Sequence, residues 1–277
     1  MHRLPTLILR VLSLLPLRAL HALGSVLGWI TYGMSPTYRR HLRAHLAQAG
    51  FSDARVRRAA ITAAGRMIAE TPAIWFRPQA EVAALVKEES GLDAALAAHA
   101  QGKEIVFLTP HLGSFEITVQ YTALRLPITA LYRPPKMRWL DPLMRAGRGR
   151  PNIHLLPADL KGVRQLFRAL KSGEAVGLLP DQVPRAGEGE WADFFGRPAY
   201  TMTLAGRLAE RDNAACFIVY GRRLPRGQGY AMVFRPLPDT LPGESPARRV
   251  NRGIEALIRE CPEQYLWGYN RYKGVAA

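Results

Sequence analysis

Apolar runs alternate with amphipathic segments along most of the chain. Short β-branched or leucine-rich runs predict buried strands at 104–109, 128–132, 153–156, 175–179, 216–220 and 230–234. Apolar positions that recur every three or four residues predict helices at 51–71, 92–100, 115–124, 137–146, 161–171, 201–212 and 247–260. Strands separated by such helices are typical of an α/β fold with a mainly parallel mixed sheet flanked by helices.

The first fifty residues form a leucine-rich run that contains Arg10 and Arg18 and no acidic residue. An arginine at the centre of a bilayer costs about 2.5–3.5 kcal/mol, and Pro16 interrupts the helix, so a spanning helix fits poorly. We expect an apolar helix or helical hairpin lying at a membrane surface, with Trp29 inserted and the arginines facing anionic headgroups. A buried core helix is the alternative. The organisation is then an N-terminal membrane-associated element over 1–50 and one domain over 51–277.

Composition narrows the classes of partner. The 277 residues carry a net charge of +16, which predicts an anionic partner such as nucleic acid, acidic headgroups or an acidic protein. The apolar N-terminus and the lack of a nucleic-acid-binding motif argue against nucleic acid. Cys216 and Cys261 form no Cys-x-x-Cys pair, which excludes a disulfide scaffold and a cysteine zinc site.

Residues capable of chemistry follow the predicted strands. In parallel α/β sheets, ligands bind beyond the carboxyl ends of the strands. Pro110-His111, Arg133-Pro134, Pro157-Ala158-Asp159 and Pro180-Asp181-Gln182 stand at these ends.

His111 and Glu116 are the strongest candidates for catalysis. If His111 lies in a turn before a helix, and Gly113 permits a tight backbone, the two side chains can converge. A carboxylate bonded to one imidazole nitrogen raises the basicity of the other, which suits deprotonation of a substrate hydroxyl. The alternative is a turn histidine that caps a backbone group and a surface glutamate near a helix start.

Basic residues are dense between Arg125 and Arg168, where only Asp141 and Asp159 oppose them. Arginine forks suit phosphate groups, so a substrate with more than one phosphate is expected. Most of these side chains fit a solvated basic face. We favour a binding role for Arg133, which ends a strand, and for Arg148, which lies in a glycine-rich turn.

The segment from Leu108 to Glu116 resembles the His-x₄-Asp/Glu box of glycerolipid-type acyltransferases. Its glutamate form is similar to the lipid A biosynthesis (lauroyl/myristoyl) acyltransferase branch. Further similar segments follow in the family's order: Tyr132-Arg133-Pro134, Asp181-Gln182, Phe194-Phe195-Gly196 and Pro262-Glu263-Gln264-Tyr265-Leu266-Trp267. Tyr269 and Asn270 depart from the His and Arg that the family often has.

The resemblance implies a glycerol-phosphate-acyltransferase-like fold at the cytoplasmic face of the inner membrane, held peripherally or by one N-terminal helix. It implies transfer of an acyl chain from acyl carrier protein to a hydroxyl of a lipid A precursor, without a metal or nucleotide cofactor. His111 would be the general base and Glu116 its partner. Arg133, Arg148, Asp181 and Gln182 would complete the site. Backbone N–H groups near Gly113 and Ser114 are candidates for binding the tetrahedral oxyanion.

Two other functions remain open at this point. One is an acyltransferase that acts on a different membrane lipid, such as an ornithine lipid or a glycolipid. The other is a non-catalytic, basic peripheral membrane protein that binds lipid, which would not require His111 or Glu116.

Overall fold

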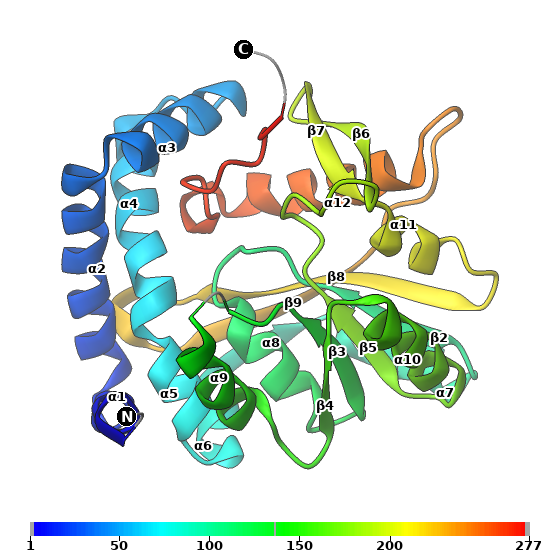
Figure 1. Ribbon diagram of the computed structural model, residues 1–277, viewed down its shortest axis with the longest axis horizontal. Helices are drawn as coiled ribbons and strands as arrows, with labels where there is room; N and C mark the ends of the chain where they lie inside the picture. Colours follow the sequence, from blue (N-terminus) through cyan, green and yellow to red (C-terminus); the bar gives the residue numbers. More distant parts are fainter. Residues whose placement is uncertain (1–2, 136, 275–277) are drawn as a thin grey trace.

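A seven-stranded sheet forms the centre of the computed structural model, which describes residues 3–135 and 137–274 (Figure 1). The strand order is β1-β9-β8-β2-β5-β3-β4. The strands are β1 (Val86–Ser90), β2 (Glu104–Leu108), β3 (Ile128–Tyr132), β4 (Ile153–Pro157), β5 (Ala175–Leu178), β8 (Ala214–Arg223) and β9 (Tyr230–Pro236). The five strands from β8 to β4 are parallel, and β9 pairs antiparallel with β8. The predicted mainly parallel mixed sheet is confirmed.

Alternating side chains of the strands separate two hydrophobic cores. In β2, Ile105 and Phe107 belong to one core, and Val106 and Leu108 to the other. The first core is covered by α7 (Leu92–Ala100) and α8 (Phe115–Thr122), with α5 (Thr71–Phe76), α6 (Gln79–Ala84) and α9 (Asp141–Arg148) around its edge. The second is covered by α10 (Leu160–Lys171), α11 (Thr203–Ala209) and α12 (Pro246–Glu260). Helices therefore flank both faces, as the sequence predicts.

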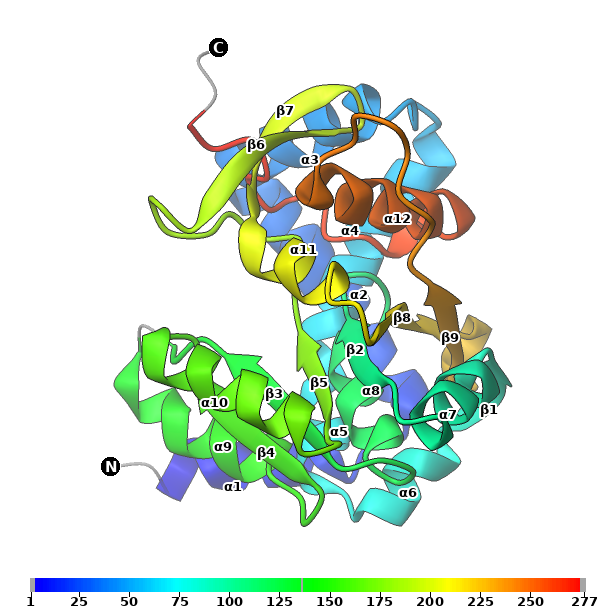
Figure 2. The ribbon, with the colours of Figure 1, turned by 90° about the vertical axis from the view of Figure 1, so that its right-hand side faces the viewer.

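An antiparallel hairpin, β6 (Gly189–Phe194) and β7 (Arg197–Met202), lies beside α12, away from the central sheet (Figure 2). The sequence predicted no strand between 180 and 200, so this hairpin was missed, and the helix predicted at 201–212 is α11, which begins at Thr203. Phe195 and Gly196 take positive φ values of 52° and 73° and close the turn. The polar strand β1 was also missed, because its sequence, Val-Lys-Glu-Glu-Ser, has no apolar alternation.

The N-terminal segment folds as α1 (Arg3–Ser13), which packs against α5, and α2 (Leu17–Met34), followed by α3 (Pro36–Gln48) and α4 (Ala54–Ala69). Pro16 lies between the first two helices, and α2 packs closely along α4. Glycine makes this contact possible: a Cβ on Gly28 would lie 2.2 Å from the carbonyl oxygen of Ile61. The single helix expected over 51–71 is α4, followed by the separate helix α5. In the described ranges, no helix has both the length and the hydropathy needed to cross a bilayer.

Gly28→Ala tests the contact between α2 and α4. The added methyl group meets backbone atoms that cannot move aside, so we expect a loss of about 1–3 kcal/mol in the free energy of unfolding. Gly33→Ala is the matched control, since it lies on the same helix and a Cβ there meets nothing within 4 Å. Denaturant titration of the two variants should separate them, and equal stabilities would show that the contact is unimportant.

Candidate active site

The pairing of β2 with β5 brings the two central residues of the site together. Leu108 of β2 is directly paired with Leu178 of β5, and the strands are parallel. His111 and Asp181 each follow three residues after these partners, so both lie at the same edge of the sheet. Parallel register thus joins two residues that are 70 positions apart in the chain.

His111 and Asp181 form two hydrogen bonds. The backbone N–H of His111 donates to Oδ2 of Asp181 at 2.8 Å, and Nδ1 of the ring lies 2.8 Å from Oδ1. Burial opposes ionisation of Asp181, but the His111 charge and these hydrogen bonds outweigh it and hold the pKa of this carboxyl below its usual value. An ionised carboxylate only accepts, so Nδ1 carries a hydrogen, and in the neutral imidazole Nε2 keeps its lone pair.

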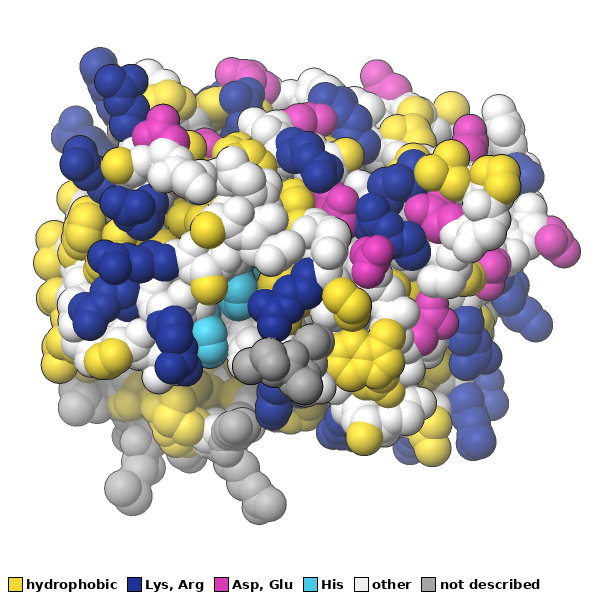
Figure 3. Space-filling model, turned by 90° about the horizontal axis from the view of Figure 1, so that it is seen from above, with side chains coloured by type: hydrophobic (Ala, Val, Ile, Leu, Met, Phe, Trp, Pro, Cys, Tyr) yellow, Lys and Arg dark blue, Asp and Glu magenta, His cyan; other side chains and the backbone are white. Residues whose placement is uncertain are grey.

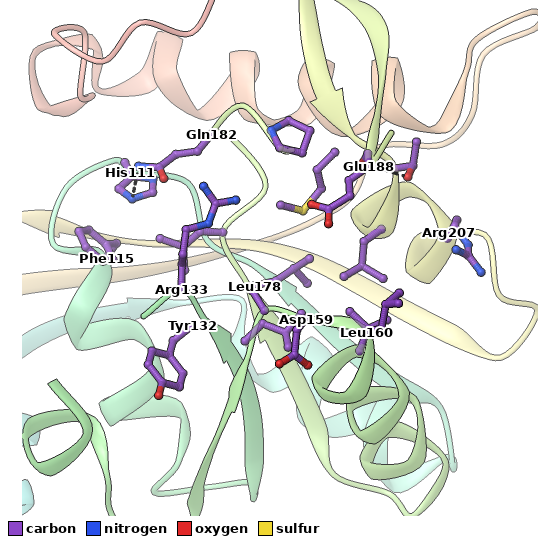
Figure 4. Close-up of a pocket in the computed structure, with 18 of the residues that line it drawn as sticks. His111, Phe115, Tyr132, Arg133, Asp159, Leu160, Leu178, Gln182, Glu188 and Arg207 are labelled. Atoms are coloured by element: carbon purple, nitrogen blue, oxygen red, sulfur yellow. Dashed lines mark hydrogen bonds between the residues drawn. The ribbon is translucent and has the colours of Figure 1, made fainter. Parts of the chain in front are cut away.

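Gln182 occupies the other side of the imidazole. Its Nε2 amide group donates to Nε2 of His111 at 3.1 Å (Figure 4). The ring of Phe115 packs against His111 with a centroid distance of 4.8 Å. The imidazole is therefore fixed in orientation, and its Nε2 atom faces the side-chain amide of Gln182.

Glu116 does not form the predicted pair with His111, and that interpretation needs correction. Its Oε2 accepts from Nε of Arg148 and from Nε1 of Trp75, both at 2.9 Å, and its Oε1 accepts from Nη2 of Arg148. Burial opposes the charge on Arg148, but Glu116 outweighs that effect and raises the pKa of Arg148. Both ring nitrogens of His111 have other partners, so Glu116 orients an arginine instead.

Backbone contacts hold the turn from His111 to Ser114, called here the catalytic turn. Gly113 has φ +58°, and a Cβ there would lie 2.2 Å from the carbonyl oxygen of Gly221. The N–H of Gly113 donates to the Gln264 carbonyl at 3.0 Å, and that of Ser114 donates to the Gly221 carbonyl at 2.7 Å. The expectation that these N–H groups bind an oxyanion was therefore wrong, because both are already bonded.

A cavity of about 440 Å³ begins at His111 and runs between the sheet edge, α10 and α11 (Figure 4). Leu131, Leu178 and Leu179 form part of its wall, and Glu188 and Arg207 lie at its far end. Four of the six site residues that the resemblance implies also line it: His111, Arg133, Arg148 and Gln182. Glu116 lines an adjoining cavity of about 50 Å³, and Asp181 is buried behind His111, 2% exposed.

Comparison with known proteins gives one consistent family. The model of the bacterial lipid A biosynthesis acyltransferases matches residues 3–274. The chain belongs to this family. It is 28% identical to a lipid A biosynthesis lauroyltransferase of Escherichia coli (strain K12) over 214 residues, 76% of this chain and 69% of that protein. It is 30% identical to a lipid A biosynthesis palmitoleoyltransferase of the same organism over 212 residues, 76% of this chain and 68% of that protein.

The site of this lipid A biosynthesis acyltransferase combines a carboxylate-bound histidine with a cavity that the histidine lines. The resemblance inferred from the segment around His111 is confirmed. Sequence reasoning missed Trp75. Its indole N–H donates to Glu116, and the Cζ atom of Arg148 lies 5.5 Å from the centroid of its ring. Trp75 belongs to no motif that indicates a chemical role. Tyr269, which the sequence marks only as a departure from the family's usual His, accepts through its hydroxyl from the N–H of Val183, next to Gln182.

The ionised state of Asp181 gives this acyltransferase a testable pH dependence of stability. The pKa of Asp181 is lowered from 3.8 in the folded protein. The ionised carboxylate therefore stabilises the fold above pH 3.8, and this stabilisation is lost as the pH falls through the folded-state pKa. We expect the stability difference between the wild type and Asp181→Asn to be constant near neutral pH and to shrink below about pH 4. Denaturant titrations across this range measure it. Asp239→Asn, at an exposed carboxyl, should show a much smaller change.

Proposed function

We propose that the protein transfers a fatty acyl chain from an acyl carrier protein thioester to a hydroxyl of a lipid A precursor. His111 is the general base, and Asp181 is its carboxylate partner. The observation that carries this proposal is the pair of 2.8 Å contacts between His111 and Asp181, with the opposite side of the imidazole lining the cavity.

The reaction follows from the tautomer that Asp181 imposes. The acceptor hydroxyl displaces the Gln182 amide from Nε2 of His111 and gives up its proton there. Its oxygen then attacks the thioester carbonyl, the carbon–sulfur bond breaks, and the imidazolium returns the proton to the leaving thiolate. A positioned base of this kind contributes about 10²–10⁴-fold.

The displaced Gln182 amide then lies beside the reacting carbonyl. We propose it as a donor to the tetrahedral oxyanion, since the backbone N–H groups of Gly113 and Ser114 are bonded elsewhere.

Arg148 and Arg133 bind the acceptor's phosphates in this proposal. Glu116 and Trp75 hold the Arg148 guanidinium at the cavity wall, so Glu116 acts through Arg148. Arg133 is exposed and rises from the end of β3 toward Gln182 (Figure 4). Two guanidinium groups at one cavity match a substrate with more than one phosphate.

Helix α2 of the N-terminal segment provides an apolar face for a membrane surface. On α2, large apolar side chains at Leu23, Val26, Leu27 and Ile30 are exposed at helical spacing, and Trp29 is 45% exposed beside them. The opposite side of α2, which includes Gly24 and Gly28, packs on α4. Exposed apolar side chains of this extent are typical of an interfacial helix. We propose residues 1–50 as the membrane-associated element and 51–277 as the acyltransferase domain.

Basic side chains accompany this face. Seen from above Figure 1, the half where α2, α3 and α4 lie shows lysine and arginine side chains with few acidic ones among them, whereas the other half shows both (Figure 3). Exposed arginines of α3 and α4 are Arg40, Arg43, Arg55 and Arg58. Anionic headgroups attract such residues at roughly 1 kcal/mol each. This supports association with the cytoplasmic face of the inner membrane.

His111→Ala and Asp181→Asn test the proposed chemistry. We expect each to lower kcat for transfer from acyl carrier protein to a lipid A precursor by about 100-fold or more, because one removes the base and the other its orientation. Mass spectrometry of the acceptor measures the added acyl chain. His154→Ala is the control, since His154 and Glu174 form a second histidine–carboxylate pair, 3.1 Å apart, outside the cavity.

Full activity of either variant would exclude this mechanism. Acyl transfer to an ornithine lipid or a glycolipid, with none to the lipid A precursor, would replace the proposed acceptor. The absence of transfer to any lipid, with lipid binding retained, would favour a non-catalytic lipid-binding protein.

Val26→Glu combined with Ile30→Glu tests the membrane face. Two carboxylates on the exposed stripe of α2 should weaken binding to phosphatidylglycerol-containing vesicles by about tenfold or more. Sedimentation with vesicles measures the bound fraction. Ala94→Glu with Ala97→Glu on α7 adds the same charge at exposed positions and should bind almost as the wild type does. If both double variants lost vesicle binding equally, the loss would result from the change in net charge and not from the apolar face of α2.

A further inference from the structure

A buried ion network lies behind the catalytic turn, outside the cavity. Glu70, at the end of α4, is 1% exposed and accepts four hydrogen bonds. Nε and Nη2 of Arg223 donate at 2.8 Å, Nε2 of His21 at 2.9 Å and the hydroxyl of Tyr230 at 3.1 Å. The network joins α2, α4, β8 and β9.

Stability alone is a poor reason for such a network. Taking a carboxylate and a guanidinium out of water offsets most of their attraction, and apolar replacements are often equally stable. Here Nη1 of Arg223 is also buried without a hydrogen-bond partner among residues 3–135 and 137–274. An arrangement with this desolvation cost is best explained by a structural role of Arg223, namely that it holds another part of the molecule in place.

Arg223 holds the catalytic turn. The same Nη2 that bonds Glu70 also donates to the carbonyl oxygen of Gly113 at 2.7 Å. Glu70 takes Nε and Nη2 together, which fixes the plane of the guanidinium and aims one N–H at Gly113. Gly113 is the residue of the turn with positive φ, two positions after His111.

The backbone of Arg223 is fixed on the same side. Its N–H donates to Oε1 of Gln264 at 2.9 Å, and Nε2 of Gln264 donates back to its carbonyl at 3.2 Å. The carbonyl of Gln264 accepts the N–H of Gly113, which closes a ring of contacts from Arg223 through Gln264 to the turn. Both polar atoms of Gly113 therefore depend on this ring.

We infer that Glu70 and Arg223 are positioning residues. They hold the Gly113 carbonyl in place and thereby fix the position and orientation of the His111 imidazole. His21 ties the same network to α2, whose other face is the apolar stripe. The kinetic part of this inference rests on the proposed role of His111; the structural part does not.

Arg223→Met tests the inference in the full-length protein. We expect amide hydrogen exchange at residues 111–114 to become about tenfold faster or more, because the turn loses a charged hydrogen bond. We expect kcat for acyl transfer to fall about 10- to 100-fold with KM values changed less than about threefold, since a displaced base slows chemistry and not binding. Arg223→Lys, which keeps a charged donor, should recover part of both losses.

Arg211→Met is the matched control. Arg211 forms a two-point ion pair with Glu104, at the start of β2, the end of the strand opposite the catalytic turn. It should leave exchange at 111–114 and kcat close to the wild-type values. If Arg223→Met does not fold, Arg223→Lys and Glu70→Gln are measured against the same control and should show smaller changes of the same kind.

Unchanged exchange at 111–114 in folded Arg223 variants would overturn the inference. A kcat loss no larger than that of Arg211→Met would do the same. If the wild type transfers no acyl chain to a lipid A precursor, the proposed function fails and the exchange measurement alone decides the positioning role.

Discussion

The register between β2 and β5 is the constraint on which the site depends. Because Leu108 faces Leu178 in a parallel pair, equal offsets of three residues place His111 against Asp181. A shift of one residue in either strand would turn its leucine from one core to the other, so burial of both Leu108 and Leu178 fixes the register. The basicity of one imidazole nitrogen is thus secured by the packing of two leucines.

Segments from both ends of the chain then hold the catalytic turn in the position that this register gives it. Residues 264–266 bond the backbone of His111 and Gly113, Gly221 accepts from Ser114, and Arg223 holds the Gly113 carbonyl. Glu70 and His21 extend these contacts to the N-terminal helices. The turn has little regular structure of its own, and it is held by elements that fold far away in sequence. In the proposed mechanism, a base positioned in this way does not need to reorganise during the reaction.

The sequence predicted six of the seven strands of the sheet, the helices that flank it most closely and several residues that line the cavity, because strand periodicity and the chemistry at strand ends are local signals. It did not predict the partner of His111. Glu116 is near His111 in sequence, whereas contact with Asp181 requires knowing that β5 lies beside β2. The hairpin of β6 and β7 was missed for a related reason, since its turn depends on positive φ at Phe195 and on packing against α12. Glu70 and Arg223 belong to no motif, and only tertiary contacts give them a role.

The carboxylates of Asp181 and Glu116, near the cavity, have different roles because they contact different partners. Asp181 contacts the imidazole on the side away from the cavity, so its charge fixes a tautomer and can stabilise an imidazolium without meeting the substrate. Glu116 contacts a guanidinium that lines the cavity, so its charge directs a cation toward the ligand. Exchanging the two roles would require Glu116 to leave Trp75 and Arg148, which would leave a buried guanidinium unpaired at a cost of several kcal/mol. The indole N–H of Trp75 therefore helps to keep the carboxylate of Glu116 away from the base, which is how a His-x₄-Glu sequence gives a histidine–aspartate pair and a glutamate–arginine pair in one site.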